Sequence, residues 1–166
     1  FAMLAASACS ERSTEIEAAR KIPVTSSSKK ALKHFHQGRE LADKLRFTDA
    51  RDYFLRAIDE DPKFALAHVG LSDALWRIFQ QDHESITLAE AEQEAEAALE
   101  LDPELPDAQV ALSRVYRSTG RYAESIGQLR QILADHPNPA EAYGQLAFSW
   151  EAAGDLEAAE ESLRYA

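Results

Sequence analysis

The chain has little of what most small catalytic and metal sites are built from. It contains one cysteine and six glycines among 166 residues, so it forms no internal disulfide and no paired-cysteine zinc site. The sequence also has no glycine-rich phosphate loop and no His-Glu-x-x-His motif. His34 and His36 lie two positions apart, which places them on different sides of a helix and prevents them from sharing a metal. We therefore expect a non-catalytic protein with no cofactor and no metal.

Basic residues are scarce as well. The 18 lysines and arginines stand against 29 aspartates and glutamates, a net charge of -11. This balance disfavours nucleic acid as a partner, because phosphates require a basic surface. No stretch alternates apolar and polar residues as a strand does, and prolines interrupt the helical segments too often for a long coiled coil. Composition and pattern together predict an all-α fold.

What the chain does have is a repeat. Pro103 and Pro137 are 34 positions apart, and so are Gly120 and Gly154. A fixed period of this length is typical of a solenoid, in which each unit is a helical hairpin that cannot bury its apolar face alone. The two glycines fall where a first helix should end, since glycine adopts a left-handed C-cap at no steric cost.

The repeat divides the chain into four units. We place them at 31–64, 65–105, 106–139 and 140–166, and expect the last to be truncated. Helices are predicted over 31–45, 48–60, 65–79, 87–101, 106–119, 122–135, 140–153 and 156–166. Thr87, with Glu90 three residues later, is expected to open the fourth helix as a capping box. The second unit is longer than the period, and its extra residues, Phe79 to Ser85, should lengthen the third helix or form a protruding loop.

The units resemble the tetratricopeptide repeat, whose pattern is W-x2-L-G-x2-Y, then A-x3-F, then a closing proline. The first unit carries this pattern at Gly38, Leu41, Ala50, Phe54, Ala57 and Pro62. The resemblance covers residues 31–166 and implies a right-handed α-solenoid of antiparallel helical hairpins with about four repeats. His34, His68 and Gln109 replace the large aromatic residue at the fourth position of their units, so we expect looser packing there.

In this family the first helices line a concave groove that holds a peptide. The residues that the resemblance places in a protein-binding groove are Phe35, Arg39, Asp73, Trp76, Arg77, Arg114, Arg117 and Phe148. Arginine and aromatic side chains are the usual anchors of protein interfaces. The alternative is that the arginines pair with acidic neighbours along the helices and bind nothing. Family members that clamp chaperone C-termini carry a lysine and an asparagine where this chain has Phe35 and Arg39, which argues against that ligand.

The N-terminal residues suggest export. Residues 1–10 are uncharged and end in small side chains, like the tail of a secretory signal peptide. Cys9 follows Ala6-Ser7-Ala8 and resembles the lipid-modified cysteine of a bacterial lipobox. A signal peptide cleaved without lipid attachment, or an end with no targeting role, are the alternatives. Residues 11–30 are polar and rich in helix breakers, so we expect a flexible tether.

Together these features predict a non-catalytic scaffold or adaptor that binds a protein or peptide partner. The resemblance to envelope lipoproteins with tetratricopeptide repeats implies a bacterial cell-envelope location facing the periplasm, with membrane attachment through Cys9. A soluble secreted or periplasmic protein is an alternative, as is a cytoplasmic one. Such repeats are also fused to protein kinases, sulfotransferases and glycosyltransferases, so the chain could instead be the accessory arm of a larger enzyme.

Overall fold

A computed structural model describes residues 26–135 and 140–166 of the chain. Every regular element in these two ranges is an α-helix. The helices are α2 (Lys29–Asp43), α3 (Phe47–Glu60), α4 (Ala65–Asp82), α5 (Ser85–Leu101), α6 (Pro106–Ser118), α7 (Tyr122–Asp135), α8 (Ala140–Ala153) and α9 (Leu156–Leu163). The N-terminal segments 1–10 and most of 11–30, with Cys9, lie outside the described residues, as does the loop that contains Pro137.

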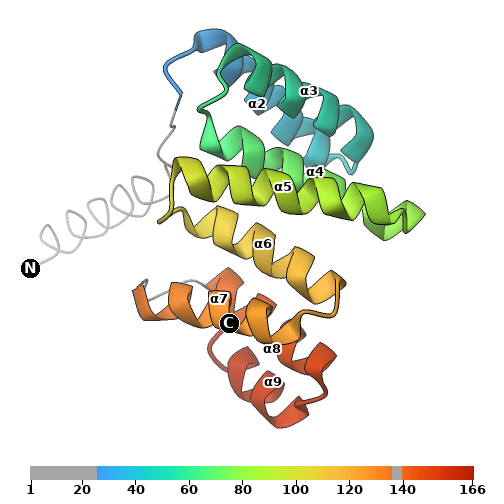
Figure 1. The fold of residues 1–166 in the computed structure, drawn as a ribbon, viewed down its shortest axis with the longest axis vertical. Coiled ribbons are helices and arrows are strands. Elements are labelled where there is room, and N and C mark those ends of the chain that lie inside the picture. Colours follow the sequence, from blue (N-terminus) through green and yellow to red (C-terminus); the bar gives the residue numbers. More distant parts are fainter. Residues whose placement is uncertain (1–25, 136–139) are drawn as a thin grey trace, which may run out of the picture.

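The helices form successive hairpins that stack in chain order from one end of the molecule to the other (Figure 1). Each first helix contacts the first helix of the next hairpin, through the pairs α2 and α4, α4 and α6, and α6 and α8. Over the residues described, no Cα atoms of two different second helices, among α3, α5, α7 and α9, come within 8 Å of each other. The first helices thus form the closely packed inner layer of the predicted α-solenoid, and the second helices form the outer layer.

The extra residues of the second unit lengthen both of its helices. α4 continues to Asp82 and α5 already begins at Ser85, so the first of our two alternatives is confirmed and no long loop forms. The predicted capping box is wrong. Thr87 lies inside α5, where its side chain is buried and its backbone N–H donates to the carbonyl oxygen of Glu84 at 3.1 Å.

The ends of the repeat region also differ from our prediction. α2 begins at Lys29, where Ser28 caps the helix by accepting a hydrogen bond from the backbone N–H of Ala31 at 3.2 Å. Ser26 is buried and its hydroxyl donates to Asp61, so residues 26–30 belong to the solenoid and not to the tether. At the other end α9 stops at Leu163, three residues before the predicted limit.

The turns between paired helices show how the repeats depart from one another. Gly120 and Gly154 have φ angles of 78° and 89°, as predicted for C-cap glycines. The backbone N–H of Arg121 bonds to the carbonyl of Tyr116 at 2.8 Å, which closes a Schellman motif. The first hairpin makes the same closure from Arg46 to Leu41 at 2.9 Å, but the left-handed residue there is Leu45, with φ 59°.

One aromatic ring of the core packs between two helices of the inner layer. Phe54, from α3, is 2% exposed. A Cβ atom built on Gly38 of α2 would lie 2.7 Å from this ring, and one built on Gly70 of α4 would lie 2.6 Å from it. Only glycine leaves room for the ring at both positions. The phenylalanine and first glycine of the repeat pattern are therefore a packing pair.

The fourth position makes different contacts in the first three units. His68 contacts Glu94 through Nδ1 at 2.7 Å and the Pro62 carbonyl through Nε2 at 3.2 Å. Its hydrogen bond to Glu94 raises the pKa of His68, since both ring nitrogens face acceptors. Gln109 makes the equivalent bond to the Pro103 carbonyl at 3.2 Å. In the first unit the Nδ1 atom of His34 is buried without a hydrogen-bond partner among the described residues. The looser packing expected at these positions stays a prediction.

We predict that Gly70→Ala destabilises the protein while Gly127→Ala does not. Both changes gain helix propensity, up to about 1 kcal/mol, but only Gly70 faces Phe54, whereas a Cβ at Gly127 of α7 would meet nothing within 4 Å. Overpacking of this kind costs roughly 1–3 kcal/mol. Urea unfolding should therefore separate the two variants by about that amount. Equal urea midpoints for the two variants would show that the Phe54 ring can move aside without a cost in stability.

Candidate functional site

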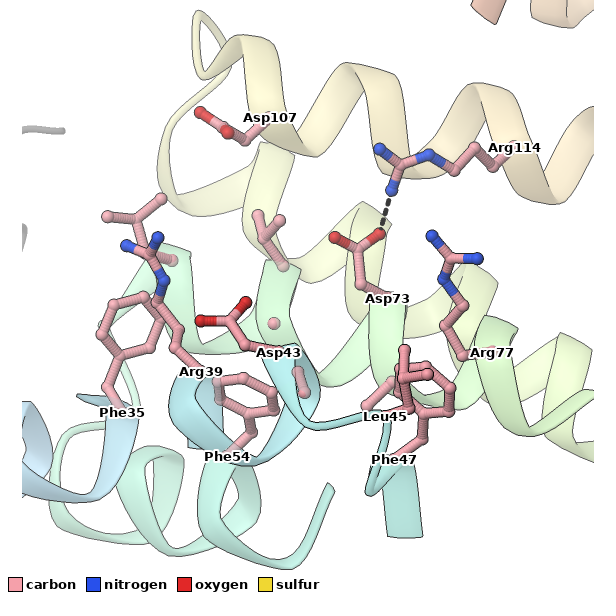
Figure 2. A pocket seen from close by; sticks show the side chains of 15 residues that line it. Phe35, Arg39, Asp43, Leu45, Phe47, Phe54, Asp73, Arg77, Asp107 and Arg114 are labelled. Carbon is pink, nitrogen blue, oxygen red and sulfur yellow. Dashed lines mark hydrogen bonds and ion pairs between the residues drawn. The ribbon is translucent and has the colours of Figure 1, made fainter. Parts of the chain in front are cut away.

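A groove with a cavity of about 490 Å³ opens on the inner layer. It lies among α2, α4 and α6, with α3 contributing from one side (Figure 2). Phe35, Phe54, Leu66 and Val69 supply apolar surface, and each of these side chains is almost completely buried. The bottom of the groove, which we call its floor, is therefore formed by apolar side chains of the protein core.

The floor is continuous because the rings pack on one another. The ring centroids of Phe35 and Phe64 lie 4.9 Å apart, and those of Phe35 and Phe54 lie 5.9 Å apart. On α4, residues 66, 69, 73 and 77 follow the i, i+3, i+7, i+11 spacing of a single helix face. Leu66 and Val69 in the floor therefore lie on the same face of α4 as two charged residues at the rim, Asp73 and Arg77.

Two arginines of the rim are held by aromatic rings and not by carboxylates. The Arg39 guanidinium lies 5.9 Å from the Phe35 ring centre. Arg77 lies 4.8 Å from the ring of Trp76 and 5.9 Å from that of Phe47. Within residues 26–135 and 140–166, neither guanidinium makes a hydrogen bond or an ion pair. Both exposed cations are therefore available to a ligand that enters the groove.

Arg114 has a different role. Its side chain is 13% exposed, and its two terminal nitrogens pair with Asp73 of α4 and Glu141 of α8. Figure 2 shows the bond to Asp73 crossing the groove wall. Because Arg114 itself belongs to α6, this side chain joins three helices of the inner layer. The alternative of internal pairing, which we left open for all the arginines, holds for this one.

The neighbours of two groove carboxylates raise the pKa of these groups. Burial raises the pKa of Asp73 and Glu141 raises it further, while Arg114 acts in the opposite direction. Burial and Glu141 also raise the pKa of Asp107, at the start of α6. Both carboxylates nevertheless keep contact with solvent, since the Asp73 side chain is 42% exposed and Asp107 is exposed.

The structure brings together five of the eight predicted binding residues. Phe35, Arg39, Asp73, Arg77 and Arg114 all line the groove. The other three lie beyond it. The expectation that Trp76 presents its ring to a partner is wrong, because this ring is 9% exposed and its Nε1–H donates to the Ser118 hydroxyl at 2.9 Å.

Arg117 and Phe148 extend the same face toward the C-terminal hairpin. Phe148, on α8, is 52% exposed. The Arg117 guanidinium lies 5.4 Å from its ring centre and donates to the Gln145 side chain at 3.1 Å. Burial and the nearby Arg114 lower the pKa of Arg117. These two residues form a separate surface next to the groove, and their binding role stays a prediction.

Sequence reasoning missed two residues at one end of the groove. Leu45 and Phe47 flank the turn between α2 and α3 and both line the cavity. They fall outside the helix positions from which we predicted the groove. Leu45 could have been found, because it occupies the turn position that is glycine in later units. Over the described residues, no group of three or more His, Cys, Asp or Glu side chains could hold a metal ion.

Comparison with known proteins agrees with this architecture. Two family models, both of the tetratricopeptide repeat, match residues 35–84 and 87–143. The chain belongs to the tetratricopeptide repeat family. No curated protein sequence matches it significantly.

Several solved structures share the fold. The first tetratricopeptide domain of Spaghetti (RPAP3), bound to an HSP90 peptide, is 20% identical, with 77% of this chain and 96% of that one covered and a TM-score of 0.66. The second such domain of human RPAP3, in complex with an HSP70 peptide, is 19% identical, covers 72% and 94%, and has a TM-score of 0.62. MamA from Desulfovibrio magneticus RS-1 is 16% identical, covers 84% and 75%, and has a TM-score of 0.65.

We predict that the arginines of this surface differ in their effect on stability. Arg114→Met leaves Asp73 and Glu141 without their cation and should lower the free energy of unfolding by about 1–3 kcal/mol. Arg39→Met and Arg77→Met keep the apolar stem and break no ion pair, so each should change it by less than about 1 kcal/mol. Denaturant unfolding of the three variants measures this. If Arg39→Met lowered the free energy of unfolding as much as Arg114→Met, the arginines would not differ in their contribution to stability as we predict.

Proposed function

We propose that this protein is a non-catalytic scaffold that binds an extended segment of a partner protein in the groove among α2, α4 and α6. One observation carries the proposal. Two guanidiniums, Arg39 and Arg77, lie against aromatic rings at the rim of an open apolar groove and form no ion pair with the described residues. Each is near enough to a groove carboxylate, Arg39 to Asp107 and Arg77 to Asp73, to lower the pKa of that carboxylate. Arginine side chains that rest on aromatic rings are common energetic anchors once a partner covers them.

The structural neighbours support a peptide as the ligand. Two of them are described as bound to peptides, one from HSP90 and one from HSP70. The inner layer of this chain offers a similar concave surface, but Phe35 and Arg39 stand where chaperone-clamping members carry lysine and asparagine. The scaffold is therefore expected to select a different peptide sequence. The apolar floor favours a ligand with apolar side chains, and the free arginines favour one that also carries carboxylates.

The groove can be tested with matched arginine variants. A display library of random heptapeptides is panned against the protein, and the selected peptide is labelled for fluorescence anisotropy. The double variant Arg39→Glu, Arg77→Glu should bind it at least about tenfold more weakly, since loss of two anchors costs more than about 1.4 kcal/mol. Circular dichroism and Tm should stay close to those of the wild type.

The control is the double variant Arg56→Glu, Arg130→Glu. These arginines are on the outer layer and also lie over aromatic rings, Arg56 4.9 Å from Tyr53 and Arg130 5.1 Å from Trp150. The control therefore matches the groove variant in net charge, and it also removes two arginines that rest on rings. It should bind the peptide like the wild type. Equal losses of affinity in both variants, or the absence of any selected peptide, would refute the groove as the binding site.

The membrane attachment of this scaffold is a separate part of the proposal. The small uncharged residues before Cys9 support a lipid anchor there, in a bacterial cell envelope. None of the helices α2 to α9 has the length and apolar content needed to cross a bilayer.

The anchor is tested on the complete precursor expressed in a bacterium with labelled fatty acid. We expect the wild type to take up the label and sediment with membranes, and Cys9→Ser to do neither. A soluble wild-type protein with an unmodified thiol would remove the anchor from the proposal and leave the groove unaffected.

A further inference from the structure

Leu45 combines two unfavourable features in the turn between α2 and α3. Its side chain is 73% exposed, although leucine is a large apolar residue. Its backbone has a φ of 59°, a left-handed conformation that disfavours any residue with a Cβ atom. An exposed leucine alone is ordinary, but a positive φ is uncommon for a bulky residue, and the two together at the edge of a groove are a reason to look for a role.

The later hairpins show that the fold does not need a leucine here. Gly120 and Gly154 occupy the same place in their turns, with φ angles of 78° and 89°. The closing backbone bonds are also the same, from Arg121 to Tyr116 at 2.8 Å and from Asp155 to Trp150 at 2.9 Å. Glycine thus makes this turn without steric cost. The side chain of Leu45 adds nothing to the turn itself.

Leu45 does contribute to the groove. It lines the cavity together with Phe47, and Figure 2 shows both beside Arg77. Arg77 lies 5.9 Å from the centre of the Phe47 ring and 4.8 Å from that of Trp76, so its guanidinium is held over apolar surface. The end of the groove is therefore an apolar patch next to a fixed cation. Its complement is an apolar side chain with a carboxylate close by in the sequence.

We propose that Leu45 determines the specificity of the groove. An apolar side chain of the bound peptide packs against Leu45 and Phe47, and a carboxylate near it in the peptide pairs with Arg77. The exposed leucine is retained at the cost of backbone strain because it is buried only in the complex. This inference rests on the proposed function and names the chemistry of the peptide that the groove selects.

The substitution Leu45→Gly tests this in two directions at once. It removes the apolar contact and also the left-handed strain. With the peptide selected from the heptapeptide library, we expect about tenfold weaker binding and a Tm that rises by a few degrees. Panning the variant should also select peptides that have lost the preferred apolar position. A leucine that only supports the fold would lower the Tm when removed.

The reciprocal control is Gly120→Leu, which introduces the same strain in the third hairpin, where a Cβ meets nothing within 4 Å. It should lower the Tm and leave peptide binding unchanged. A second measurement tests the charge pair. It combines Arg77→Gln in the protein with a Glu→Gln or Asp→Asn change in the peptide. If the two groups pair, the combined change should weaken binding by less than the sum of the two separate effects.

The outcomes separate this inference from the proposed function. If the wild type selects no peptide, the proposed function fails and the inference falls with it. If the wild type selects a peptide and Leu45→Gly binds it equally well, the scaffold stands and the role of Leu45 is refuted. A lower Tm in Leu45→Gly would also refute it, because the side chain would then serve the fold.

Discussion

The close approach of α2 and α4 around the Phe54 ring determines the geometry of the whole groove. Gly38 and Gly70 have no Cβ atom, so one ring from α3 fits between the two helices. Arg39 directly follows one of these glycines, and Arg77 lies seven residues, or two helical turns, beyond the other. The spacing that the ring imposes on the helix axes therefore also sets the spacing of the two free guanidiniums.

The inner layer uses the same residue type for two physical purposes. Arg114 is largely withdrawn from water and lies between two carboxylates, so it stabilises the contact of α4, α6 and α8. Arg39 and Arg77 are exposed and rest on rings, where a cation loses little hydration and gains a modest attraction to the ring face. An arginine of the first kind cannot leave its partners for a ligand without exposing unpaired charge. One of the second kind can accept a carboxylate at little cost.

Much of this architecture could be predicted from the sequence, because a local pattern that recurs at a fixed period indicates that distant segments form similar hairpins and stack. The glycine caps at Gly120 and Gly154 and the hairpin order follow from the period, whereas the inner position of Phe35, Arg39, Asp73 and Arg77 follows from the resemblance to the tetratricopeptide repeat. The capping box at Thr87 could not be excluded, since the start of α5 depends on where α4 ends. Burial of Trp76 and the ion pairs of Arg114 depend on neighbouring hairpins, and a one-dimensional repeat does not encode those contacts.

In a repeat protein each unit serves as an internal comparison for the others. A residue that packs between neighbouring units is explained by stacking, as with Gly38 and Gly70 around Phe54. At the turns inside the hairpins, two units use glycine, while the first has Leu45 and the second has His83, both with a positive φ. The turn of the first hairpin has the same closing bonds as those of the last two, so these are the turns to compare. A leucine is not required at this turn, because two other hairpins make the same turn and the same backbone bonds with glycine. The strain at Leu45 is the observation behind our proposal that this side chain serves a contact with a bound peptide and not the turn.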